Sequence, residues 1–138
     1  MDYRQLTAPC GLDCFNCAVY RASTDEAVRA KVAERLGISL EQAACPGCRA
    51  THGAPGHFCG SGPCKVWRCI SQRGHEFCFE CADFPCDALH PYADKAAERP
   101  HNTKVFNLCL MKRMGVERWA EEKAAAVRKT YYEAKFDI

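Results

Sequence analysis

The chain has 138 residues, twelve of them cysteines, and a formal net charge of +2 from 19 basic and 17 acidic side chains. This length suits one domain, and the near balance of charge gives no strong signal for binding nucleic acid. No stretch approaches the roughly 20 apolar residues of a membrane span, and the N-terminus lacks the apolar core of a signal peptide.

We therefore expect a cytoplasmic protein without membrane contacts. The hydrophobic fraction of 48% includes cysteine, so the apolar content available for a core is low and another source of stability is needed. In a reducing compartment, closely spaced cysteines bind metal or carry out redox chemistry more often than they form lasting disulfides. The compartment thus favours metal binding over a disulfide scaffold.

The first predicted helix begins at Ser23, where the run Ser-Thr-Asp-Glu has the form of a capping box with Ser23 as the N-cap. Apolar residues spaced four apart continue this helix until Gly37 ends it. A shorter helix is predicted over residues 39–44, with Gln42 completing a second capping box. Residues 49–63 contain four glycines and two prolines without periodicity, which predicts a loop.

The middle of the chain predicts two further segments. One is a helix over residues 65–73 that Gly74 closes. The other opens at Asp83 and runs to Arg99, with a break or restart at Pro91.

The last third predicts two helices, one ended by Gly115 and one continuing toward Tyr131. We expect them to form an antiparallel pair that packs its apolar stripe against the cysteine-rich part. The expected fold is mainly α with irregular metal-stabilised loops. It is a small single domain over residues 1–138, with zinc knuckles in a metal-binding part (1–90) and the C-terminal helix pair (91–138).

Three C-x-x-C pairs carry the chemistry: Cys14–Cys17, Cys45–Cys48 and Cys78–Cys81. Such a turn places two sulfurs close enough to bind one ion, and zinc prefers four thiolates in a tetrahedron at ~2.3 Å. The second pair encloses Pro46 and Gly47, which suit the two central positions of a type II turn. Three pairs in one chain therefore predict metal binding, with two zinc ions expected.

The remaining cysteines gather around these pairs, and ten of the twelve divide into two candidate sites with one additional candidate ligand each. The first site is Cys14, Cys17, Cys45 and Cys48, with Cys10 as the additional candidate; the second is Cys69, Cys78, Cys81 and Cys86, with Cys64 as the additional candidate. Cys64 and Cys69 would point about 140° apart on a regular helix. At most one of them is then expected to bind from within the helix.

Other residues have plainer interpretations. Cys109 lies among apolar neighbours and is expected to be a buried core thiol. Cys59 is expected to be a free thiol of the glycine-rich loop, although a ligand role for Cys59, His52 or His57 stays open. The histidines are isolated in sequence and are expected to be surface or capping residues: His52, His57, His75, His90 and His101.

Two more specific chemical interpretations of the cysteine motifs are excluded by the length of the chain and by the surrounding sequence. The spacing Cys10, Cys14, Cys17 resembles the cluster motif of radical S-adenosylmethionine enzymes, which need a large α/β barrel that this chain is too short to supply. Cys45-Pro-Gly-Cys48 resembles a dithiol oxidoreductase site, but such sites follow a strand and begin a helix. Here a helical pattern precedes the pair and a loop follows it.

The motifs taken together resemble a prokaryotic cysteine-rich family, the domain of unknown function 3795. They are Ala8-Pro9-Cys10-Gly11-Leu12-Asp13-Cys14-x-x-Cys17, Cys45-x-Gly47-Cys48-Arg49, Cys64-x4-Cys69, Cys78-x-x-Cys81-x-Asp83-Phe84-Pro85-Cys86, and the later Asn107-Leu108 and Gly115-Val116-Glu117-Arg118-Trp119. The resemblance implies a small zinc-binding protein of unassigned activity. The loop from Thr51 to Pro63 is longer and richer in ligands than the family pattern, which leaves a third ion or a replaced ligand open.

The sequence thus predicts a zinc-binding protein whose closed four-cysteine sites are structural rather than catalytic. A protein-interaction or regulatory module, with a protein partner of unknown identity, is the function we expect. The alternative is an iron–sulfur or thiol-redox sensing protein, because cysteine ligands alone do not separate zinc from iron.

Overall fold

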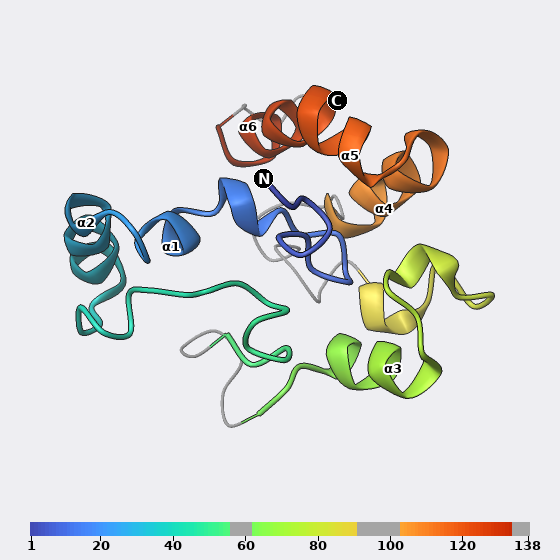
Figure 1. Ribbon diagram of the computed structural model, residues 1–138, viewed down its shortest axis with the longest axis horizontal. Helices are drawn as coiled ribbons and strands as arrows, with labels where there is room; N and C mark the ends of the chain where they lie inside the picture. Colours follow the sequence, from blue (N-terminus) through green and yellow to red (C-terminus); the bar gives the residue numbers. More distant parts are fainter. Residues whose placement is uncertain (56–61, 91–102, 134–138) are drawn as a thin grey trace.

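The protein is described by a computed structural model that covers residues 1–55, 62–90 and 103–133 (Figure 1). The described part is mainly helical, as predicted, and forms no strand, only an isolated bridge between Thr7 and Asp13. In chain order its elements are η1 (Cys14–Asn16), α1 (Ala18–Arg21), α2 (Glu26–Leu36), α3 (Lys65–Arg73), η3 (Cys78–Glu80), η4 (Asp87–Leu89), α4 (Thr103–Met114), α5 (Val116–Trp119), η6 (Ala120–Ala124) and α6 (Ala125–Glu133).

The N-terminal segment runs through the middle of the molecule. In the view of Figure 1, α4, α5 and α6 lie above it, α1 and α2 to its left, and α3 below and to its right. Residues before the first C-x-x-C pair are therefore in a position to contact both the later cysteines and the C-terminal helices.

Helix α2 starts two residues later than the sequence predicts. Its N-cap is Asp25, whose side chain accepts a hydrogen bond from the Val28 amide at 3.0 Å. Ser23, the predicted cap, instead donates its hydroxyl to the Cys45 carbonyl at 2.9 Å. The predicted end is confirmed, because Gly37 adopts the left-handed conformation with φ +64° that helix C-termini favour.

The prediction of a short helix over residues 39–44 is wrong. The reciprocal contacts of the capping box do form, since Ser39 and Gln42 each donate a backbone amide to the other's side chain at 3.1 and 3.2 Å. The chain nevertheless makes only a turn there. Pro46 disfavours the helical conformation for Cys45, so the single turn has no continuation.

The predicted bounds of helix α3 are confirmed at both ends, and Gly74 ends the helix in the left-handed conformation with φ +67°. The predicted segment from Asp83 to Arg99 forms only the short η4 within the described residues. Its continuation past Pro91 lies in 91–102, outside the described residues.

The two C-terminal helices are confirmed. Helix α4 ends before Gly115, and α5, η6 and α6 then follow one another without interruption, η6 being a π-helical stretch. Trp119, fully buried, donates its indole N–H to the Asn107 side chain at 3.3 Å and so connects the two helices.

Cys109 is exposed, so the prediction of a core thiol is wrong. Helix α4 turns Asn107, Leu108, Leu110 and Met111 inward. Cys109 therefore faces outward, on the side where Phe106 is 55% exposed.

One core joins the cysteine-rich part to the C-terminal helices. Val66 of α3, Phe77 before η3 and Leu89 of η4 pack with buried residues of α4, α5 and η6. A smaller cluster holds α2 against α1 through Ala22, Val32 and Ala33. Among the described residues, no helix has the length and apolar character needed to cross a bilayer.

Candidate metal centres

The first predicted site is assembled from two turns that face each other. The turn η1 carries Cys14 and is closed by the Cys17 amide, which donates to the Cys14 carbonyl at 2.9 Å. The second turn has the predicted geometry, because Gly47 adopts φ +103°. Its Gly47 amide donates to the Cys45 sulfur at 3.4 Å.

Contacts across these two turns bring the first set together. The Cys48 amide donates to the Cys14 sulfur, and the thiols of Cys17 and Cys45 interact electrostatically with Cys14. Burial is the main reason that the pKa of Cys14 is raised from 9.0 to about 11, with the Cys48 amide opposing it. A backbone N–H that points at sulfur favours the thiolate form, which is the form that binds metal.

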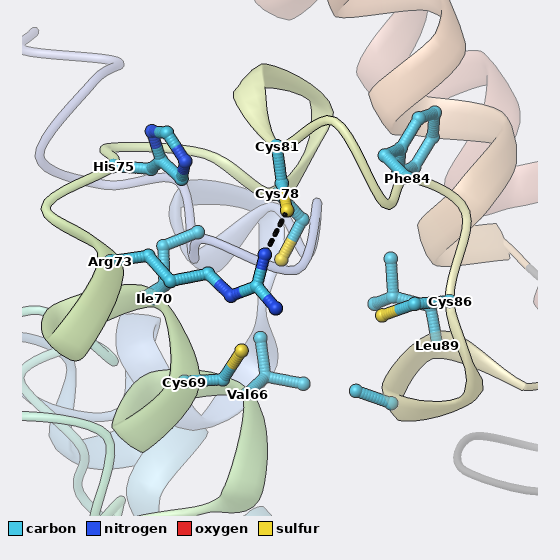
Figure 2. A pocket seen from close by; sticks show the side chains of 11 residues that line it. Val66, Cys69, Ile70, Arg73, His75, Cys78, Cys81, Phe84, Cys86 and Leu89 are labelled. Carbon is cyan, nitrogen blue, oxygen red and sulfur yellow. Dashed lines mark hydrogen bonds between the residues drawn. The ribbon is translucent and has the colours of Figure 1, made fainter.

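The second predicted site surrounds one pocket, which Figure 2 shows from close by. All four cysteines of this set line it: Cys69 from α3, Cys78 and Cys81 from η3 and its end, and Cys86 before η4. Burial first, and then the neighbouring thiols, raise the pKa of Cys78 from 9.0 to about 12. The pocket also holds Arg73 and His75.

The two additional candidate ligands, Cys10 and Cys64, are partly buried and both pack against the main core. Cys10 interacts with Cys64, and it is also a neighbour of Cys14 in the first site and of Cys78 in the second. The Pro9 carbonyl accepts the Cys78 amide at 3.0 Å, which fixes this junction. Cys10 is partly buried, and burial raises the pKa of its thiol despite the opposing charge of Lys104.

Cys64 is placed as the N-cap of α3 rather than within the helix. Its sulfur accepts a hydrogen bond from the Trp67 amide at 3.4 Å. Only Cys69 is thus presented from within the helix, as the spacing of the two cysteines predicts.

The cysteines of each predicted site lie in the same region, but their sulfurs do not surround a common ion position. In residues 1–55, 62–90 and 103–133, no three histidine, cysteine or acidic side chains are arranged to hold one metal ion. The candidate ligands Cys59 and His57, and also His101, lie outside the described residues. His52 is exposed, and its ring meets Trp67 edge-on at 5.9 Å.

Arginines that the sequence reasoning did not single out contact both sites. Arg73 donates one N–H group to the Cys81 sulfur at 3.0 Å and to Asp83 at 2.7 Å. Arg128 of α6 donates to Asp13 at 2.7 Å. The available signal was an aspartate within two residues of the Cys14–Cys17 and Cys78–Cys81 pairs, because a carboxylate beside thiolates needs a nearby cation.

A third arginine connects the segments that carry the cysteines. Arg49, directly after Cys48, donates to the carbonyls of Arg4 and Thr7 at 2.9 Å and to that of Glu76 at 3.0 Å. Its guanidinium also lies 4.8 Å from the centre of the Phe77 ring. Arg49, which follows Cys48 of the first site, is thereby held against Glu76 and Phe77, which directly precede Cys78 of the second site.

Comparison with known proteins gives one match. The family described as a protein of unknown function, DUF3795, matches residues 6–91, which include ten of the eleven cysteines within the described residues. No curated protein and no solved structure matches the chain. Since the match covers more than half of the sequence, the chain belongs to the DUF3795 family.

Proposed function

We propose that this chain is a zinc-binding protein with two structural four-cysteine sites, and that it acts as a protein-interaction or regulatory module. The observation that carries the proposal is the placement of the thiols. Two turns distant in sequence, at Cys14 and Cys45, face each other in the first set, and four cysteines surround one pocket in the second.

The chemistry of the donors fits zinc. Each set offers four sulfurs, and N–H donors already point at sulfur in both, from the Cys48 amide in the first and from Arg73 in the second. Rotation about a single bond changes the direction in which a cysteine sulfur points, so the side chains of each set would turn inward when they bind an ion. Zinc would then cross-link segments that share only a small apolar core.

Four thiolates fill the tetrahedral shell of zinc and leave no position for a substrate. The ions would therefore maintain the shape of the surface rather than perform a reaction. Contact with a partner protein is the activity that such a surface supplies.

Native mass spectrometry compared with denaturing mass spectrometry tests the proposal. We expect two zinc ions on the freshly purified protein and none after denaturation in acid. Cys45→Ser and Cys78→Ser should each retain one ion, whereas Cys109→Ser, at an exposed position, should retain two.

Two results would overturn the proposal. One is a protein that is isolated without metal, yet compact and unaffected by chelators. The other is visible absorbance of anaerobically purified protein that disappears in air, which would assign the thiols to an iron–sulfur cluster instead.

A further inference from the structure

The two C-F-x-C knuckles have the same local structure and the same kind of neighbour. Cys14-Phe-Asn-Cys17 and Cys78-Phe-Glu-Cys81 each form a single 3₁₀ turn closed by a hydrogen bond from the second cysteine amide, at 2.9 and 3.2 Å. An arginine is paired with an aspartate adjoining each knuckle, Arg73 with Asp83 and Arg128 with Asp13. The two arginines come from different helices, α3 and α6.

Arg73 reaches the second pocket from the last turn of α3 (Figure 2). Its guanidinium is hydrogen-bonded to the Cys81 sulfur at 3.0 Å and paired with Asp83 at 2.7 Å. The pKa of Arg73 is raised, first by the hydrogen bond to Asp83 and then by the charges of Cys81 and Cys69. Arg73 is therefore in contact with the knuckle thiol of Cys81, and Cys69 of α3 lines the same pocket.

Arg128 has the corresponding place at the first site. It donates to Asp13 at 2.7 Å, and Asp13, only 4% exposed, also accepts from Asn16 within the knuckle at 2.9 Å. Burial alone would lower the pKa of Arg128, but attraction to Asp13 and then to Cys17 outweighs burial and raises it.

We propose that Arg73 and Arg128 are outer-sphere residues of the two zinc sites, each compensating thiolate charge while its aspartate holds the guanidinium in place. The inference rests on the proposed function. A zinc ion with four thiolates carries two net negative charges, so a cation in contact with the sulfurs stabilises the bound state. A guanidinium N–H bound to sulfur also draws charge from it, which lowers its reactivity as a nucleophile.

The test uses the zinc-loaded full chain and measures two quantities: zinc affinity by chelator competition, and the alkylation rate of each cysteine by iodoacetamide with peptide mapping. For the second site the variant is Arg73→Met, with Arg68→Met, at an exposed position of the same helix, as its matched control. For the first site it is Arg128→Gln, which removes the positive charge and can still donate a hydrogen bond to Asp13, with Lys129→Gln at an exposed position as its control.

In Arg73→Met we expect affinity for one of the two ions to fall about 10-fold, and alkylation of Cys69 and Cys81 to accelerate by a similar factor. Cys17 and Cys45 should keep their wild-type rates. The first-site variant should show the reverse pattern, and Arg73→Lys should recover part of the loss because it restores the charge without the planar fork.

Two results would overturn the inference while leaving the proposed function intact. Zinc-loaded Arg73→Met could show wild-type affinity and rates, which means that the guanidinium does not act on the sulfurs. Alternatively, the alkylation rates of the thiols at both sites could rise equally in each variant, which would indicate a loss of stability of the whole fold. A wild-type protein that carries no zinc would instead overturn the proposed function, and this inference with it.

Discussion

Replacing Asn107 by alanine should be one of the most damaging single changes outside the cysteines. Asn107 is 2% exposed and bridges three parts of the structure. Its amide nitrogen donates to the Gly11 carbonyl at 2.9 Å, and its amide oxygen accepts the Trp119 indole N–H at 3.3 Å. The substitution leaves a carbonyl of the first cysteine loop and a fully buried indole N–H without their partner.

Each buried polar group left unsatisfied costs about 1–3 kcal/mol. Two such groups give a loss of about 4 kcal/mol in the free energy of unfolding, measured by urea titration of the purified protein with circular dichroism and tryptophan fluorescence. At roughly 3 °C per kcal/mol for a chain of this size, the melting temperature should fall by roughly 12 °C.

Asn16→Ala is the matched control. The side chain of Asn16, at a partly buried position, donates one hydrogen bond to Asp13 at 2.9 Å, and Asp13 keeps its contact with Arg128 when that bond is removed. We expect this variant to lose about 1 kcal/mol. If Asn107→Ala costs no more than Asn16→Ala, the assignment of Asn107 as the link between the cysteine loop and the C-terminal helices is refuted.

Three further predictions follow from single positions. A Cβ at Gly53, whose φ is +78°, would overlap Trp67, so Gly53→Ala should lower the free energy of unfolding by about 3 kcal/mol in urea titration. Gly37→Ala, with open space around it, is the control and should lower it by about 1 kcal/mol. Similar losses in the two variants would contradict the packing of Gly53 against Trp67. Burial raises the pKa of Cys14 to about 11, so this thiol is protonated at neutral pH without metal. Zinc binding should therefore release protons, and zinc affinity should weaken as the pH falls. Zinc affinity that does not depend on pH would contradict thiolate ligation. Cys109→Ser should change the free energy of unfolding by less than about 0.5 kcal/mol because the thiol is exposed, and a loss above about 1.5 would return it to the core.

Local signals in the sequence predict the elements whose geometry is determined by neighbouring residues. The helix from Lys65 to Arg73 and the turn at Gly47 appear as expected, since a C-terminal glycine and a Pro-Gly pair specify their own conformation. The grouping of the cysteines into two sites stays a prediction, because C-x-x-C spacing constrains each pair locally but does not determine which pairs meet.

What sequence reasoning missed depends on contacts between distant residues. Ser23 does not cap α2 because its hydroxyl bonds to the Cys45 carbonyl, and no pattern around Ser23 reveals that partner. Cys109 has apolar neighbours in sequence, but its face of α4 is chosen by Asn107 and Leu108, which meet the Gly11 loop. Arg128 at the first site was missed because it is 115 residues from its partner Asp13.

That separation has a consequence for how the protein is made. Ribosomes extend chains at about 5–20 residues per second, so the 115 residues between Asp13 and Arg128 take roughly 6–23 s to synthesise. During this interval the first knuckle already exists, whereas helix α6 does not. Asp13 can therefore pair with Arg128 only after that helix has been synthesised, and until then the knuckle lacks the cation that the folded protein places beside it.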